Sequence, residues 1–442
     1  MLQTLRSVAS LLAGVSALIL GNSLLGIVLP IRLGTVGYHA PTIGLVMAAY
    51  FAGLVVGSLY GQRLIGRIGH VRAFAAFAAI ASIAALLHAM WLAALPWAIL
   101  RFTVGVCMAG LLATIESWLN LRSANETRGR ILSFYQVTVY LAAGIGQFLV
   151  NAWAIDALQL FCLAALLLTL SLVPVVLTRV PGPEPGQAAP LPFRELRAIS
   201  PLGVAGAFGA GLMGGGFFGM GAVFGHAAGL SVFEVSLLMG AAMFGGLLLQ
   251  WPIGRLSDKT DRRTVLFGML IAETAVCLLQ FGSWIAAGAL APLLVLAALF
   301  GGVQATIYPV SVAHAFDYVE RHRMVAASSG LLLAWAVGAT CGPLVASWVM
   351  GALGNASLFL YLAAVAAGLA AFTRYRMGQR VGRPPQEQSV FVPLPTTTAV
   401  SGQLDPRLEP PPESQAGEIL PPGDDSQADS MPRSLDRRLP LG

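Results

Sequence analysis

Long runs of apolar residues alternate with short clusters of charged residues along most of this chain, from about Val8 to Arg376. A run of roughly 20 apolar residues, rising about 1.5 Å per residue, is long enough to cross the hydrocarbon core of a bilayer. Because lipid offers the backbone no hydrogen-bond partner, such a run must form a helix. The pattern predicts twelve membrane-spanning helices, at about residues 8–29, 41–62, 72–91, 96–119, 129–152, 155–177, 200–222, 233–254, 264–285, 290–314, 324–350 and 354–375.

The composition supports a membrane location, since 57% of the residues are hydrophobic and only 10% are charged, far from the average of soluble proteins. The first run follows Arg6 and so resembles a signal peptide, but it is too long and lacks a small-x-small cleavage site. We therefore predict that it is a retained first helix. All four cysteines fall inside predicted helices without metal-ligand spacing, so we expect no disulfide framework and no metal site.

Basic residues gather in every second loop, and this asymmetry predicts the orientation of the helices. The loops of this side hold Arg63, Arg67, Arg72, Arg122, Arg128, Arg130, Arg179, Arg194, Arg197, Arg255, Lys259, Arg262, Arg263, Arg321 and Arg323. The opposite loops offer little beyond Arg32. We therefore expect both termini in the cytoplasm and the protein in the inner or plasma membrane of the cell. The net charge of +6 is a consequence of this topology and does not indicate nucleic-acid binding, because the arginines are scattered over short loops.

Two segments do not belong to the membrane. Residues 178–199, rich in proline and glycine, are expected to form a cytoplasmic linker, in which residues 193–199 could form a short interfacial helix. Residues 379–442 are rich in Pro, Ser, Asp and Glu and poor in aromatic residues, so we expect a disordered cytoplasmic tail. The linker divides the membrane helices into an N-terminal half, residues 1–177, and a C-terminal half, residues 200–378.

The two halves resemble each other at a fixed offset. Residues 110–115 recur as residues 302–307, with Gly-x-x-Ala-Thr-Ile in both places, and the same shift of 192 residues pairs Gly53 with Gly245. Past the next loop the shift becomes 196, because the second-half loop is longer. The repeat predicts an all-α integral membrane protein whose twelve transmembrane helices form two parallel six-helix repeats.

The loop after the predicted eighth helix has a family signature. Residues 254–263 have the sequence GRLSDKTDRR, which resembles the loop G-x-L-x-D-R-x-G-R-R of the major facilitator superfamily, with Asp261 in place of the second glycine. The equivalent first-half loop, residues 62–69, has Gly66 at the position of the acid.

Further motifs extend this resemblance. Residues 101–105, RFTVG, are similar to the R-x-x-x-G motif of the superfamily. Together with residues 250–256 (QWPIGRL), Tyr308-Pro309 and Glu116-Ser117, they make the chain most similar to the YcaD-like branch. The resemblance covers about residues 8–376 and implies the major facilitator fold.

The resemblance also implies a gate at the cytoplasmic side, where the eighth helix abuts the fifth. Asp258 would face the N-terminus of helix five, a contact of roughly 0.3–2 kcal/mol; alternatively, these charges only set the topology. Glu116, near the cytoplasmic end of helix four, would pair with arginines of the gate or, alternatively, carry a proton. The expected gate residues are Arg67, Arg72, Glu116, Arg128, Arg130, Gly254, Asp258, Lys259, Arg262 and Arg263.

A central cavity lined mainly by helices one, four, seven and ten is a further implication of the resemblance. Arg101 would attract an anion there or take part in proton coupling, unless its side chain extends to the membrane interface. Glu273 lies in the middle of helix nine, which belongs to the outer ring of helices. Its carboxyl group would either face a residue of a neighbouring helix or carry a proton. Candidates for the cavity wall are Asn22, Arg101, Thr114, Phe217, Phe218, Gln304 and Tyr308, with Gln136, Tyr140, Gln250 and Trp335 from helices five, eight and eleven.

These features predict a secondary active transporter that moves a small organic solute by alternating access. Protons are the expected coupling ion, with downhill solute flow as an alternative, and the apolar cavity favours export. We expect a monomer in the lipid bilayer without a cofactor. The alternative is a non-transporting sensor or scaffold that signals through its tail. An enzyme is not expected, because the sequence has no recognisable nucleophile–base pair, metal cluster or P-loop.

Overall fold

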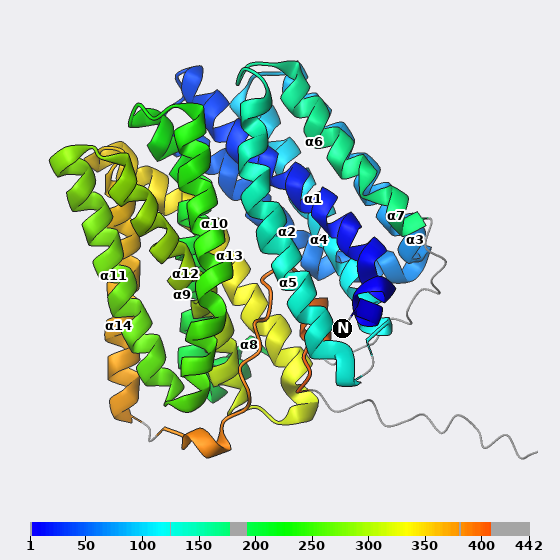
Figure 1. Ribbon diagram of the computed structural model, residues 1–442, viewed down its shortest axis with the longest axis vertical. Coiled ribbons are helices and arrows are strands. Elements are labelled where there is room, and N and C mark those ends of the chain that lie inside the picture. The colour runs from blue at the N-terminus through cyan, green and yellow to red at the C-terminus, as the bar shows by residue number, and fades with distance from the viewer. Residues whose placement is uncertain (1, 124, 177–191, 380–381, 408–442) are drawn as a thin grey trace, which may run out of the picture. The chain divides into compact units, whose positions relative to one another are not determined.

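The computed structural model describes residues 2–123, 125–176, 192–379 and 382–407, and every regular element in these ranges is helical (Figure 1). Twelve helices of the described chain are long and apolar enough to cross a membrane, which confirms the prediction from hydropathy. The helices are α1 (Leu2–Thr35), α2 (Ala40–Ile68), α3 (His70–Met90), α4 (Ala94–Leu121), α5 (Asn125–Phe148), η1 (Leu149–Ala152), α6 (Leu158–Leu170), α7 (Leu172–Val176), α8 (Phe193–Ile199), α9 (Pro201–Ala227), α10 (Val232–Lys259), α11 (Arg262–Ala287), α12 (Leu290–Phe316), η2 (Arg321–Arg323), α13 (Met324–Leu353), α14 (Ser357–Gln379), η3 (Pro385–Glu387) and η4 (Ala399–Leu404).

Helix boundaries follow from local capping. Before α10, the Ser231 hydroxyl accepts the N–H of Glu234, and the Glu234 carboxylate accepts the N–H of Ser231 at 2.7 Å. Asp261 caps α11 by accepting the N–H of Arg263 at 2.9 Å. Gly288 ends α11 with φ +56°, a conformation that glycine adopts without a steric penalty. The departure of Asp261 from the family signature therefore has a local cause, since it begins the next helix.

The sixth predicted span is not one continuous helix. The span is divided at Ser171 into α6 and α7. The hydroxyl of Ser171 donates to the carbonyl of Leu168 at 2.6 Å. Pro174 has no N–H to donate to the carbonyl of Leu170, so one helical hydrogen bond is lost at this point. The uninterrupted helix expected over residues 155–177 is corrected to a broken one for this reason.

The helix packing repeats between the two halves, as the sequence offset predicts. In the first half α2 packs on α4, α1 on α5 and α3 on α6; in the second half α10 packs on α12, α9 on α13 and α11 on α14. The paired glycines Gly53 and Gly245 have the same structural role in the two halves. A Cβ on Gly53 would collide with the carbonyl of Phe102, and a Cβ on Gly245 would collide with the carbonyl of Ala298. Glycine at both positions lets the helix backbones approach closely.

The helix bundle has two ends, which we name by their loops. We call the end with the basic loops of residues 63–72, 122–130, 255–263 and 321–323 the arginine-rich end, and the other the opposite end. Across the interface α1 packs on α9, α2 on α13 and α5 on α10.

At the opposite end, this packing brings small residues together. Gly44 of α2 faces α13 so closely that a Cβ would lie 2.7 Å from the carbonyl of Pro343, and it would also collide with Ser347. A Cβ on Gly34 of α1 would lie 2.8 Å from the ring of His226. Helices α2 and α13 therefore lie very close together at the opposite end, with only the small side chain of Ser347 next to Gly44.

At the arginine-rich end, a segment from beyond the membrane helices lies between the halves. Residues 382–407, here called the strap, include η3 and η4 and run upward between α5 and α13 in Figure 1. Helix η4 packs against α4 and α5 of one half and α13 of the other. The interface between the halves is thus filled by the chain itself at this end.

The strap corrects our expectation of a disordered tail for the described residues 382–407. Val392, Leu394, Val400 and Leu404 are buried. The expectation averaged composition over residues 379–442, and that average concealed a short apolar run, FVPLP, at residues 391–395. Residues 380–381 and 408–442 lie outside the described residues.

The expected linker is described only at its end. Residues 177–191 lie outside the described residues, whereas α8 forms where a short helix was considered. Leu196 is buried, and Glu195 forms an ion pair with Arg323 at 2.7 Å. This pair ties α8 to the start of α13 at the arginine-rich end.

Candidate functional site

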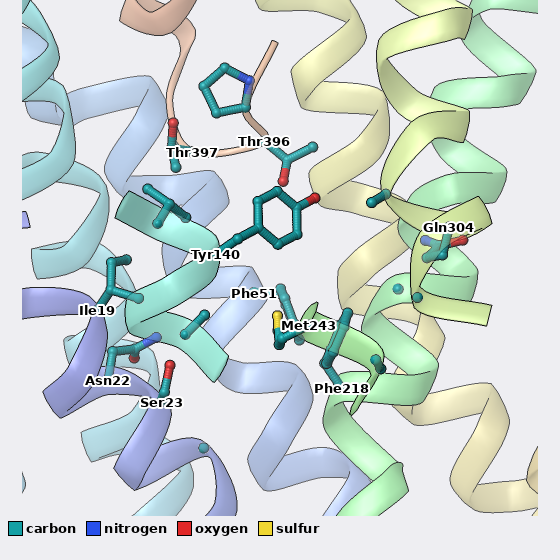
Figure 2. Close-up of a pocket in the computed structure, with 18 of the residues that line it drawn as sticks. Ile19, Asn22, Ser23, Phe51, Tyr140, Phe218, Met243, Gln304, Thr396 and Thr397 are labelled. Carbon is teal, nitrogen blue, oxygen red and sulfur yellow. The ribbon is translucent and has the colours of Figure 1, made fainter. Parts of the chain in front are cut away.

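A cavity of about 280 Å³ lies between the two halves. Its wall comes from α1, α2, α4 and α5 on one side and from α9, α10, α12 and α13 on the other. Figure 2 shows the strap residues Thr396 and Thr397 at one edge of the cavity, with the ring of Tyr140 directed toward the opposite half. The wall is mostly apolar, with Phe51, Phe218 and Met243 among its side chains.

Most of the predicted wall residues line this cavity: Asn22, Arg101, Gln136, Tyr140, Phe218, Gln304, Tyr308 and Trp335. Three others do not. The Thr114 hydroxyl donates to the carbonyl of Gly110 in its own helix at 2.8 Å. Phe217 packs on Phe300 inside the C-terminal half, with ring centroids 4.5 Å apart. Gln250 donates to the carbonyl of Ala305 at 3.1 Å and joins α10 to α12. Each of the three bonds to or packs on a neighbour within its own half, and none of them is part of the wall of this cavity.

Arg101 provides the positive charge of the cavity. Its side chain is buried, so it does not extend to the membrane interface. The guanidinium lies 4.4 Å from the ring centre of Tyr50, and Nη1 donates to Oδ1 of Asn22 at 3.4 Å. Asn22 in turn donates to the hydroxyl of Tyr50 at 3.1 Å. Nε of Arg101 has no partner, and within the described ranges no carboxylate pairs with this arginine. The site can therefore attract an anionic group.

Glu116 lies where the cavity meets the strap and is fully buried. The Tyr135 hydroxyl donates to its Oε1 at 2.7 Å. The hydroxyls of Thr397 and Thr398 donate to Oε1 and Oε2 respectively. The carboxylate is therefore satisfied by three hydroxyl groups, two of which belong to the strap.

The expected cluster of Glu116 with arginines is not formed. Arg67, Arg72 and Arg130 are exposed, and Glu116 has no ion pair in the part of the chain that the structure describes. The strap, and not these arginines, contacts the Glu116 carboxylate. No pattern in the loop sequences could predict this contact.

Asp258 also bonds to the strap rather than to helix α5. Its Oδ1 accepts the N–H of Phe391 at 2.6 Å and lies 3.5 Å from Nη2 of Arg262. The ring of Phe391 lies against Gly254, where any side chain would collide with it. Helices α5 and α10 do pack together, but Asp258 makes no bond to Arg128 or Arg130. The predicted contact of Asp258 is corrected accordingly.

Arg262 forms a buried centre next to this contact. Nη1 bonds to Oδ1 of Asp317 at 2.6 Å and to the carbonyl of Ala313 at 3.0 Å, and Nη2 donates to the carbonyl of Ser389. Asp317 also accepts the N–H of Ser389 at 3.1 Å. Burial raises the pKa of Asp317, and the charge of Arg262 and the bonds from Ser389 offset this only in part. Asp317 is thus an anchor of the strap.

The remaining gate candidates divide by exposure. Arg263 forms an ion pair with Asp261 at 2.6 Å. Burial raises the pKa of Asp261, but the hydrogen bonds and charge of Arg263 outweigh it and leave that pKa below its ordinary value. Lys259 is exposed, and Arg128 is half-buried. Several residues of the expected gate contact the strap, namely Glu116, Gly254, Asp258, Arg262 and Arg263.

Glu273 does not reach the cavity. It is fully buried in α11, and neither of its carboxylate oxygens has a hydrogen-bond partner among the residues that the structure describes. Gln280, two turns further along the same helix, is buried without partners as well. The carboxyl group therefore belongs to the interior of the C-terminal half and not to the interface between the halves.

Sequence reasoning missed two groups of residues. Tyr50 lies beneath Arg101, and Tyr135 donates to Glu116, but aromatic residues on apolar helices give no distinctive pattern. The strap residues Thr396, Thr397 and Thr398 were missed because their segment was treated as one polar tail. The apolar run just before them was the available indication.

Comparisons with known proteins agree with this architecture. The profile of the Major Facilitator Superfamily matches residues 11–231 and 203–408. An MFS-type transporter of Enterobacter sp. (strain 638), described as uncharacterized, is 28% identical over 364 residues, which is 82% of this chain and 93% of that protein. The uncharacterized MFS-type transporter YcaD of Salmonella typhi is 28% identical over 366 residues, covering 81% and 93% of the two chains.

Solved structures share the fold at low sequence identity. The nucleoside transporter NupG superposes with a TM-score of 0.66 at 15% identity, covering 83% of this chain and 97% of that one. A bacterial homolog of the human lysosomal transporter Spinster, in an inward-facing and unoccupied conformation, superposes with a TM-score of 0.65 at 13% identity, covering 92% and 99%.

Proposed function

The chain belongs to the Major Facilitator Superfamily, and from this premise we propose that it is a secondary active transporter that moves a small organic solute by alternating access. The observation that supports this proposal is the cavity between the halves, since helices of both halves line it. A rocking motion of one half against the other would expose such a cavity to each side of the membrane in turn.

We further propose that the arginine-rich end is cytoplasmic, so that the described conformation faces inward. The positive-inside rule supports this orientation, because the basic loops all lie at one end. The tight α2–α13 contact at the opposite end would then close the cavity toward the outside. The Spinster homolog, whose structure is described as inward-facing, has a similar fold.

The solute class follows from the cavity wall. A volume of about 280 Å³ fits a small molecule, and the apolar side chains fit an apolar body. Arg101, which has no carboxylate partner among the described residues, fits an anionic group. We propose an apolar organic anion, and the apolar wall favours export. Proton coupling is supported by Glu116, a buried carboxyl group beside the cavity that pairs with no cation in the described chain.

Flux in proteoliposomes tests this proposal. A panel of apolar organic anions would be offered with and without an imposed pH gradient, in right-side-out and inverted preparations. Arg101→Gln should raise KM for the anion by roughly 30-fold or more, since truncating one partner of a buried charge pair costs about 2–5 kcal/mol. Arg63→Gln, which removes an exposed arginine that is not part of the cavity wall, is the matched control. Absence of flux for every solute, with specific solute binding retained, would favour a sensor instead.

A pH-gradient experiment separates coupling from transport. In Glu116→Gln, flux driven by a pH gradient should be lost, while exchange of labelled for unlabelled solute at equal pH continues. If the variant still accumulates solute against its gradient, Glu116 does not carry the proton.

A further inference from the structure

We propose that the strap is an autoinhibitory segment that blocks the cytoplasmic mouth of the cavity and holds the two halves in the inward-facing arrangement. Transport then requires the strap to leave the interface. This proposal rests on the alternating-access function proposed above, and it assigns to that function a regulatory device within the same chain.

The first supporting observation is that the strap bonds to both halves. On the C-terminal half, Asp258 of α10 accepts from Phe391, and Arg262 of α11 donates to Ser389. On the N-terminal half, Glu116 of α4 accepts from Thr397 and Thr398. A segment bonded to both halves fixes the distance between them.

The second observation is steric. Pro395, Thr396 and Thr397 form part of the cavity wall, and Figure 2 shows Thr396 and Thr397 at one edge of the cavity. Because the strap also bonds to Asp258 and Arg262 at the arginine-rich end, it occupies the route from the cavity toward that end. Helix η4 packs against α4 and α13 at the same time. Those two helices cannot approach each other at this end while η4 lies between them. The docked strap therefore prevents both release of solute to this side and closure of this side.

The third observation concerns the kind of contact. Glu116 and Asp258 are carboxylates on opposite halves, and each accepts a hydrogen bond from the strap. At the far end of the strap, Gln403 accepts from Asn120 of α4 at 3.4 Å, and Arg407 lies 4.9 Å from the ring of Phe316 of α12. Groups that leave such hydrogen bonds can bond to water instead. Because the strap follows α14 and is separate from every membrane helix, it can leave without unfolding one.

Cross-linking tests whether the strap docks, independently of transport. In a background with the four native cysteines replaced by alanine, Gly402→Cys is combined with Ser328→Cys of α13. A Cβ on Gly402 would lie 2.9 Å from Cβ of Ser328, so a small shift permits a disulfide. We expect the disulfide to form on mild oxidation in membranes and to stop flux, which reductant restores. Each single cysteine variant is the control, and failure of the pair to cross-link overturns the proposal.

Truncation tests whether docking inhibits. Deleting residues 384–442 removes the strap, and deleting residues 409–442 retains it as the matched control. If the docked form predominates by about ten to one, removal of the strap should raise the initial flux about tenfold, while the control stays at the level of the full chain. Thermal unfolding in detergent verifies that both proteins fold, and Thr397→Val with Thr398→Val should give an intermediate rise in the full chain.

The outcomes separate the two proposals. Equal or slower flux without the strap, in a folded protein that transports, overturns the autoinhibitory role and leaves the transport function standing. Absence of flux in the full chain and in both truncated proteins, with the cross-link formed, overturns the transport function and with it the inhibition.

Discussion

The two ends of the interface between the halves are closed by different means. At the opposite end, Gly44 and Gly34 let helices of the two halves come into direct contact. At the arginine-rich end, Glu116 and Asp258 accept hydrogen bonds from an inserted segment and hold it in place. Direct helix contact can open only if the halves move, whereas an inserted segment can leave on its own. The comparison suggests that the opposite end opens with the transport cycle and that the arginine-rich end has a second level of control.

The largest expected effect comes from breaking the direct contact. Gly44→Ala would place a Cβ 2.7 Å from the carbonyl of Pro343, so α2 and α13 must separate. Overpacking of this kind costs about 1–3 kcal/mol, which shifts the balance of states by roughly 5- to 150-fold toward opening at the opposite end. The measurement is the reactivity of Met47→Cys in the cavity toward an impermeant maleimide in intact cells.

Gly61→Ala is the control for that variant, because it lies on the same helix with its nearest neighbour 3.8 Å from the added Cβ. It should leave the reactivity unchanged. Equal reactivity of both variants would show that the α2–α13 contact does not close the opposite end.

A smaller effect is expected from weakening the inserted segment. Asp258→Asn removes the charge from the acceptor of the Phe391 N–H, which lies at 2.6 Å. A hydrogen bond to a charged group contributes about 1.5–3 kcal/mol, and partial exposure of Asp258 reduces this to about 1 kcal/mol. The ratio of docked to free strap should fall about fivefold. From a ratio of about ten to one, the docked fraction, and with it the rate of cross-linking between Gly402→Cys and Ser328→Cys, should fall from about 0.91 to about 0.67, and the flux carried by the free form should rise about fourfold. Asp156→Asn, an exposed acid at the opposite end, is the control, and unchanged cross-linking in Asp258→Asn would mean that Asp258 does not hold the strap.

The smallest effect is expected from an acid outside the interface. Glu273 is buried in α11 and touches neither the cavity nor the strap. Glu273→Gln keeps the size of the side chain, so we expect flux and cross-linking to stay within about twofold of the parent protein. A loss of proton-driven flux in this variant alone would place the coupling site inside the C-terminal half and contradict the assignment to Glu116.

The fold could be predicted from the sequence because each membrane helix is specified locally. Hydropathy located the twelve helices, and the offset that pairs Gly53 with Gly245 anticipated the repeated packing of α2 on α4 and α10 on α12. The break at Ser171 was the exception, although Pro174 was available to indicate it.

The site was less predictable because it depends on contacts between distant parts of the chain. Residues such as Asn22, Arg101 and Gln304 were found from their position on the right helices. The strap partners of Glu116 and Asp258 lie more than a hundred residues away, in a segment whose mean composition is polar. Hydropathy and loop motifs describe neighbours in the sequence, and they cannot identify such partners.

The position of the strap after α14 has a consequence for biosynthesis. The ribosome makes all the membrane helices before residues 382–407, so the bundle can assemble before its mouth is occupied. A chain cut by a protease just after Gln379, or ended early by a nonsense codon there, would keep every membrane helix and lose its inhibitor. Loss of this segment would therefore produce a transporter without its inhibition rather than an inactive protein, and its effect on the cell would be a gain of activity.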